Sequence, residues 1–125
     1  NLNSEVTIGN FIFGDTATST AGSWVITNGT GGSLILAGTT PTITVNALGT
    51  SKFASIQATL GGTSGFTKNG AGNMILNNAA NTISGPIVMN GGNVQLNSAS
   101  LTNATSVAIN AGNLIIATTS ANAVG

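Results

Sequence analysis

The chain has 125 residues, of which only 3% are charged, and its formal net charge is zero. It has two basic residues, no histidine and no cysteine, so it lacks a basic surface for nucleic acid, a thiol metal site and a disulfide. No apolar run approaches the roughly 18 residues of a membrane span, and we expect neither a span nor a nucleic acid partner. The chain does not begin with methionine, and we expect a processed product or a fragment of a longer protein.

Residues 1–31 are the least regular part of the chain. Val6–Ile8, residues 11–13 and Trp24–Ile26 are typical of short strands. We interpret the bulk of Trp24 as part of a wider first coil or as a plug at the end of the core. The alternative is an aromatic platform for a sugar, although no charged partner lies near Trp24 in the sequence.

A rhythm of twenty residues follows from Gly32 onward. A short apolar triplet recurs at residues 34–36, 54–56, 74–76, 94–96 and 114–116. The dipeptide Gly-Asn precedes the last three triplets, at Gly72, Gly92 and Gly112. A fixed period of this length predicts a solenoid in which each repeat forms one coil.

Alternation within the triplets predicts which side chains face the core. The two outer positions are always apolar, and strand side chains alternate between faces, so we expect these positions to point inward. The residues expected to be buried include Met74, Leu76, Val94, Leu96, Leu114 and Ile116. The middle positions, expected to point outward, are Ile35, Ser55, Ile75, Gln95 and Ile115. The outward isoleucines are either covered by another part of the assembly or ordinary scattered surface residues.

The recurring asparagines Asn73, Asn93 and Asn113 allow two interpretations. They are either turn residues alone or turn residues that also form a ladder of hydrogen-bonded amides along the stack. We favour the turn with the ladder.

A second strand follows the first in each coil, in residues 43–45, 66–67, 87–89 and 107–109. The last two are in register with each other, whereas the earlier two slip by a residue or more, so we expect the coil lengths there to vary. No stretch has helical periodicity. The sequence therefore predicts an all-β protein, a parallel β-helix (β-solenoid) with about 20 residues per coil and roughly five to six coils. We expect one domain over residues 1–125, with irregular first coils in 1–31 and regular coils of 20 residues in 32–125.

Residues 65–96 resemble the autotransporter-associated β-strand repeat of bacterial surface and secreted proteins. The matching residues are Gly65, Phe66, Lys68, Gly70, Gly72, Met74, Leu76, Asn81, Thr82, Gly85, Val88, Gly92, Val94 and Leu96. Two positions depart from the pattern, because Ile83 stands where an aromatic is frequent and Pro86 where a second glycine is common. The resemblance covers about a quarter of the chain. It implies a right-handed parallel β-helix, an extracellular or cell-surface setting and no catalytic activity.

Candidate chemistry is sparse. Glu5 and Asp15 are the only acids, which are too few for a calcium site. A glycosidase would need these two carboxylates to come together as a pair, and we interpret them instead as solvated surface groups. For Lys68 we expect a role in keeping the coil edge soluble or in bonding backbone carbonyls at a turn; a substrate role is the alternative. The glycosylation patterns at Asn28 and Asn103 are expected to be unmodified turns. We expect no enzyme, no cofactor, and no catalytic, cofactor-binding or metal-binding residues.

Three functions remain for such a chain. The first is a structural segment of an extracellular bacterial stalk, adhesin or filament that stacks end to end, with itself or with adjacent repeats of the same chain as partner. The second is a glycan-binding β-helix module that uses the outer strand faces and binds a cell-surface glycan. The third, an ice- or mineral-binding face of threonines, is weak because Thr42 and Thr44 are not repeated in phase. Residues 117–125 are small and neutral, so we expect them not to shield Leu114 or Ile116.

Overall fold

The structure of the protein is a computed structural model that describes residues 1–17 and 20–117. The described residues form three parallel sheets and no helix, and we call the sheets side 1, side 2 and side 3. Side 1 consists of β1 (Val6–Ile8), β4 (Ser33–Leu36) and β7 (Thr59–Gly61). Side 2 consists of β2 (Asn10–Phe13), β5 (Thr42–Val45), β8 (Phe66–Asn69), β10 (Gly85–Met89) and β12 (Ala104–Ile109). Side 3 consists of β3 (Trp24–Ile26), β6 (Phe53–Ile56), β9 (Asn73–Leu76), β11 (Asn93–Leu96) and β13 (Asn113–Ile116).

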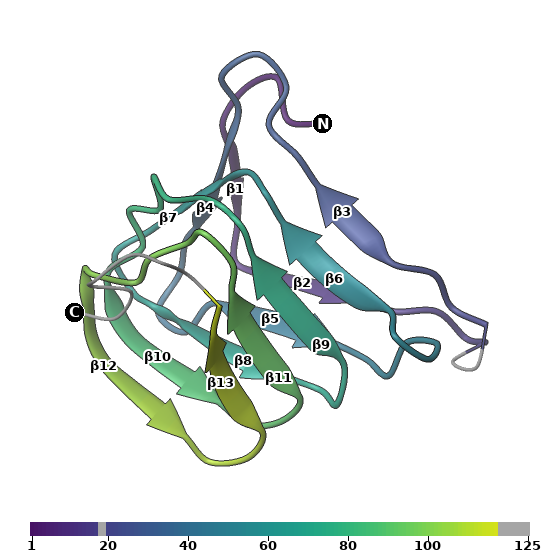
Figure 1. Ribbon diagram of the computed structural model, residues 1–125. Helices are drawn as coiled ribbons and strands as arrows, with labels where there is room; N and C mark the ends of the chain where they lie inside the picture. Colours follow the sequence, from purple (N-terminus) through teal and green to yellow (C-terminus); the bar gives the residue numbers. More distant parts are fainter. Residues whose placement is uncertain (18–19, 118–125) are drawn as a thin grey trace.

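Each turn of the chain contributes one strand to side 2 and one to side 3. Every strand therefore pairs only with strands of the coils before and after it, always in parallel. Figure 1 shows the strands of side 3 lying next to one another from β3 to β13. The five strands of each long sheet mark five coils. The predicted all-β parallel β-helix is confirmed.

Alternating side chains build the core between the three sides. In β9, Met74 and Leu76 are fully buried, whereas Ile75 between them is only partly buried. Val94 and Leu96 repeat this arrangement one coil later, twenty positions along the chain. Removing such a side chain from water contributes about 1.5–3 kcal/mol, and these side chains are stacked in columns along the axis. The inward and outward assignment of β9 and β11 is confirmed.

The twenty-residue period holds only for part of residues 32–125, so that prediction is wrong for the early coils. Ala54 pairs with Met74 twenty positions later, but Leu34 pairs with Leu60 on side 1, 26 positions later. The triplet at residues 34–36 therefore does not lie in the side 3 column. The reason is that the early coils have a third side, formed by β1, β4 and β7, and the triplet is part of β4; the short strand β7 was not predicted.

The burial predictions for Leu114 and Ile116 are wrong. Leu114 is only partly buried and Ile116 is 53% exposed, because β13 is the last strand of side 3 in the described part of the chain and has β11 as its one neighbour there. Ser55 occupies an outward position but is 3% exposed, since its small side chain lies between Val25 and Ile75 of the adjacent strands. The expectation about shielding by residues 117–125 falls, beyond Ala117, outside the described residues.

The outward isoleucines do not form one stripe. Ile35 lies on side 1, whereas Ile75 and Ile115 lie on side 3. Ile35 and Ile75 are partly buried, and Ile115 is 41% exposed. The three isoleucines therefore do not lie on one face, and the cover over Ile75 and Ile115 stays a prediction.

Glycines allow the coils to approach one another at the corner between sides 2 and 3. A Cβ atom on Gly92 would lie 2.2 Å from the backbone oxygen of Gly72 in the coil before it. Gly112 would place a Cβ atom even closer to the backbone of Gly92. Both glycines also have positive φ angles, of 66° and 87°, which L-residues with a side chain rarely adopt. The glycine column therefore determines how closely consecutive corners stack.

Candidate functional site

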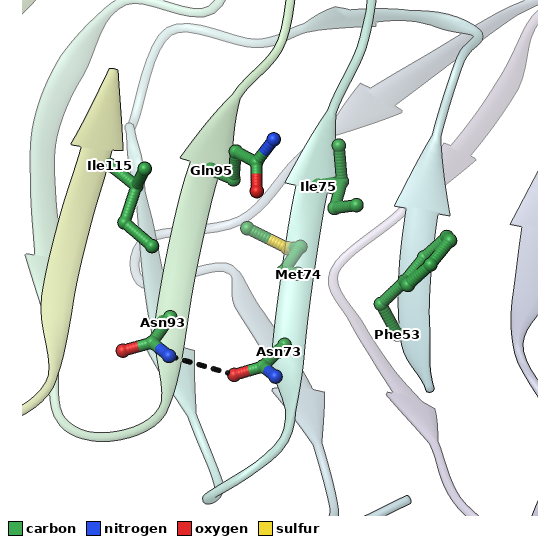
Figure 2. Close-up of a pocket in the computed structure, with 7 residues that line it drawn as sticks. All are labelled: Phe53, Asn73, Met74, Ile75, Asn93, Gln95 and Ile115. Atoms are coloured by element: carbon green, nitrogen blue, oxygen red, sulfur yellow. Dashed lines mark hydrogen bonds between the residues drawn. The ribbon is translucent and has the colours of Figure 1, made fainter. Parts of the chain in front are cut away.

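A shallow groove lies on the outer face of side 3, across β6, β9, β11 and β13. Its volume is about 120 Å³. Figure 2 shows its lining in two rows, one with Ile75, Gln95 and Ile115 and one with Asn73, Asn93 and Phe53. The groove combines an apolar floor with amide groups along one edge, and an aromatic ring stands at one end of the amide row.

The edge of the groove is the predicted amide ladder, which we call the side 3 ladder. The Nδ2 atom of Asn93 donates a hydrogen bond of 3.0 Å to Oδ1 of Asn73 (Figure 2). Asn113 donates in the same way to Oδ1 of Asn93, also at 3.0 Å. Each hydrogen bond joins two coils through residues twenty positions apart, so the predicted ladder is confirmed, although Asn73, Asn93 and Asn113 are the first residues of β9, β11 and β13 and not residues of the turn. Phe53, which pairs with Asn73, continues the row in the coil before.

A second ladder, the side 2 ladder, was not predicted. Asn90 donates from Nδ2 to Oδ1 of Asn69 at 3.0 Å, and Asn110 donates to Oδ1 of Asn90 at 2.8 Å. These asparagines stand at the end of β8 and directly after β10 and β12, so the two ladders flank the same corner. The spacings of 21 and 20 residues were present in the sequence, but the shift of one residue concealed the column.

Lys68 lies under this corner, inside the stack. Its side chain is 0% exposed, and its neighbours in the adjacent strands are the core residues Ile43 and Met89. The Nζ atom donates to the backbone oxygens of Gly70 at 2.7 Å, Gly72 at 2.8 Å and Gly91 at 2.8 Å. Two of these oxygens belong to its own corner and one to the next coil. The ammonium group thus ties two coils together, which confirms the expected bonding of turn carbonyls and excludes a role in surface solubility.

Burial determines the acidity of this amine. Desolvation lowers the pKa of Lys68 from 10.5 to about 8, because a buried ammonium loses its hydration. The three carbonyl oxygens favour the charged form, so the group remains mostly protonated at neutral pH. All three donors of the ammonium are used, and the side chain does not reach the outer surface. The geometry supports a structural role and gives a substrate no access to Nζ.

The other charged residues lie apart from the groove. Glu5, Asp15 and Lys52 are exposed. Asp15 accepts a hydrogen bond from the backbone N–H of Ala17 at 3.2 Å, which is typical of a turn residue. Among residues 1–17 and 20–117, no three His, Cys, Asp or Glu side chains come together as a metal site.

Trp24 is not among the residues of the groove. It pairs with Ala54, a fully buried residue of side 3, so Trp24 stands in an inward column at the open end of the first coil. It is 46% exposed there. This placement fits the expected plug of the core end better than the sugar platform. Asn28 and Asn103 are both exposed, and Asn28 forms an isolated bridge with Leu2.

Comparisons of the chain with models of protein families, with curated proteins and with solved structures give no match. The fold and the corner define the class of protein on their own: a parallel β-helix whose coils are joined by two amide ladders and a buried lysine. Across the described part of the chain, no helix has the length and apolar character to cross a membrane.

Proposed function

We propose that the chain is a non-catalytic structural segment of an extracellular bacterial stalk, adhesin or filament, and that its terminal coils stack on further β-helical coils. The observation that carries the proposal is the end of the stack formed by β12 and β13. Among residues 1–17 and 20–117, β12 and β13 are the last strands of their sheets, and Ile109 and Ile116 of the inward columns are 48% and 53% exposed. Unpaired strand edges next to an apolar cross-section are the surfaces that join neighbouring repeats in solenoids.

The small number and the separation of the ionisable groups support a structural role over an enzymatic one. Three of the four charged side chains are exposed singly, and the fourth is enclosed by backbone carbonyls. The extracellular setting is supported by the resemblance of residues 65–96 to the autotransporter-associated β-strand repeat. In that setting the chain would act mechanically, by extending or presenting other parts of a surface protein.

Elongation of the particle tests the proposal. A variant that repeats residues 58–117 directly after Ala117 adds three coils in phase, because residue 58 follows β6 as residue 118 follows β13. The rod should lengthen by about 14 Å at about 4.8 Å per coil, with an unchanged cross-section, in small-angle X-ray scattering. Separate melting of the added residues, or no lengthening, would contradict the proposal.

A matched pair of substitutions at the junction sharpens this test. In the lengthened variant, Leu114→Lys places a charge in an inward column between two coils and should uncouple the added coils. Ile115→Lys, one residue away and on the outer face, should leave the lengthened rod intact. Equal effects of the two substitutions would show that the added residues are not stacked.

Glycan binding in the groove of side 3 is the second candidate. The specific observation is the row of Phe53, Asn73 and Asn93, since a sugar offers apolar C–H groups to an aromatic ring and hydroxyls to amides. Binding of a glycan on an array, lost on Phe53→Ala but kept on Ile12→Ala at an exposed position of side 2, would support this function. If the chain binds no glycan, only the structural function remains as a candidate.

A further inference from the structure

One position of the amide row on side 3 is not an asparagine. Phe53 in β6 occupies the place that Asn73, Asn93 and Asn113 occupy in the three later coils. The Nδ2 group of Asn73 therefore has no ladder acceptor in the coil before it, and within residues 1–17 and 20–117 it donates no hydrogen bond. Local departures from a regular pattern are expected at functional sites. This end of the side 3 ladder thus places an aromatic ring beside amide hydrogens that are open to a ligand.

A second open amide lies in the apolar row of the groove. Gln95 stands between Ile75 and Ile115, its partners in the adjacent strands, and Figure 2 shows the three side chains on the same face. In the described part of the chain, no side-chain hydrogen bond of this face involves Gln95. A glutamine amide contains both a donor and an acceptor. The apolar floor therefore offers one of each at its centre.

The groove carries no charge and is too small for a whole ligand. None of its lining residues is ionisable, and Lys52, next to Phe53 in the sequence, is not part of the lining. Its volume of about 120 Å³ is well below the roughly 300–1,000 Å³ of pockets that enclose a drug-sized molecule. The groove therefore fits a neutral substituent of a larger molecule, the rest of which would lie on the outer face of side 3.

The spacing of the two open amides selects the kind of substituent. Asn73 and Gln95 are one coil and two positions apart, because Gln95 pairs with Ile75. With about 4.8 Å between strands and about 3.3 Å per residue, their backbones are roughly 8 Å apart. A secondary amide in the trans form directs its C=O and its N–H in opposite directions. One such amide can therefore accept from Nδ2 of Asn73 and donate to Oε1 of Gln95.

An acetamido group on a sugar ring supplies this amide together with its apolar neighbours. Its methyl group suits the side chain of Ile75, and the C–H face of the sugar ring suits the ring of Phe53. An extended peptide also has secondary amides, but it cannot add here as a strand. The backbones of β9 and β11 are paired on both sides within side 3. The chemistry of the groove therefore favours an N-acetylated sugar over a peptide.

We propose that the groove of side 3 binds uncharged glycans that carry N-acetyl groups. Asn73 and Gln95 hold the acetamido group, and the sugar ring lies on Phe53. The inference rests on glycan binding, the second candidate function, and narrows it from sugars in general to neutral N-acetylated amino sugars. A polymer of plain hexose offers only hydroxyls in this place, so it leaves the side chain of Ile75 without an apolar partner.

Two tetrasaccharides that differ only in this substituent test the inference. The β-linked tetramers of N-acetylglucosamine and of glucose share their glycosidic linkage, and the first has an acetamido group where the second has a hydroxyl. Isothermal titration calorimetry of the full chain should show at least about tenfold tighter binding of the N-acetylated tetramer, because two hydrogen bonds and a methyl contact are added. Gln95→Leu should remove most of this preference. Phe53→Ala should weaken the binding of both tetramers, and Ile12→Ala on side 2 should change neither.

Nuclear magnetic resonance of the unmodified chain gives a second measurement that needs no variant. The side-chain NH₂ signals of Asn73 and Gln95 should shift when the N-acetylated tetramer is added. The internal controls are the asparagines of the side 2 ladder, which have the same chemistry on another face and should not shift: Asn69, Asn90 and Asn110.

The outcomes separate this inference from glycan binding itself. Equal affinities for the two tetramers, with shifts in the groove, would overturn the inference and retain glycan binding on side 3. Shifts confined to residues outside the groove would overturn the assigned site. If neither tetramer binds but another glycan does, the preference for N-acetyl groups is wrong, whereas a chain that binds no glycan at all contradicts the second candidate function.

Discussion

At the scale of single residues, Lys68 occupies a position that apolar residues fill in the adjacent coils. Its neighbours in the side 2 column are Ile43 and Met89. The aliphatic stem of a lysine is compatible with such a column, and the ammonium extends to the carbonyl oxygens of the corner. The charge therefore serves to satisfy backbone acceptors that a tight, glycine-rich corner leaves inside the stack.

Replacing this ammonium should be costly. Lys68→Met keeps the apolar stem but removes three charge-assisted hydrogen bonds and leaves buried carbonyl groups without that donor. We expect a loss of about 3 kcal/mol in the free energy of unfolding, measured by urea denaturation at pH 7. Lys52→Met is the matched control at the other lysine, which is exposed, and should change stability by less than about 0.5 kcal/mol.

The same variant tests the pH dependence. The folded-state pKa of Lys68 is lowered, to about 8, so between pH 8 and 10.5 the unfolded chain binds more protons than the folded one. The free energy of unfolding of the native chain should therefore rise across this range, by up to roughly 3 kcal/mol. The rise should be absent in Lys68→Met and retained in Lys52→Met. A rise of equal size in both variants would assign it to another group.

The middle asparagine of the side 3 ladder gives a second test at this scale. Asn93→Ala removes the hydrogen bonds to Asn73 and Asn113 at once. We expect a loss of about 1–2 kcal/mol in the free energy of unfolding, since the amides are partly accessible to water. Gln95→Ala, on the same strand and facing the same groove, has no such bonds and should cost less than half as much. Similar losses in the two variants would mean that the ladder stabilises the fold through side-chain packing and not through its hydrogen bonds.

At the scale of elements, the strands were the most predictable feature. Alternating apolar residues identified the strands of sides 2 and 3, because a side chain that points into the narrow core is apolar in nearly every coil, with Lys68 of β8 as an exception. β7 was missed because it has three residues and includes Gly61, which gives no alternation to recognise. The side 2 ladder was missed because one coil is a residue longer than the next.

Glycines form the corners between sides 2 and 3, and the stacking of these corners can be tested separately from their backbone conformation. Gly92→Ala and Gly31→Ala both place a Cβ atom at a positive φ, of 66° and 82°. Only Gly92 has the backbone of the coil before it within 2.2 Å, whereas nothing lies within 4 Å of a Cβ atom on Gly31. We expect Gly31→Ala to cost about 1 kcal/mol from conformation alone and Gly92→Ala to cost several kcal/mol more. Calorimetric melting of the two variants measures the difference, and equal costs would show that the corners are not tightly stacked.

At the scale of the whole molecule, the sequence allowed a correct prediction of the all-β parallel β-helix and of the approximate number of coils. The exact length of the early coils could not be predicted from the sequence. Leu34 and Leu36 repeat the apolar pattern at a twenty-residue phase, although they pair on side 1. A period read from one chain identifies a column only where consecutive strands of one side are separated by the same number of residues. On side 3 that condition holds from β6 onward, where three consecutive steps are twenty residues each.

The coils shorten along the chain, from 32 residues between Phe11 and Ile43 on side 2 to 20 between Met89 and Ile109, and this has a consequence for the order of folding. Closing a coil of 32 residues costs about 0.4 kcal/mol more entropy than closing one of 20, and the ten residues between β2 and β3 must be ordered as well. The compact coils around Lys68 should therefore form the nucleus, and the first coil should join it late. Leu76→Ala should then slow refolding, whereas Phe13→Leu in the first coil should mainly speed unfolding, as measured in stopped-flow chevron plots. Because the ribosome releases the first coil before the later ones, the first coil has no folded coil to pack against at that time. Its strands therefore stay exposed until the compact coils around Lys68 have been made.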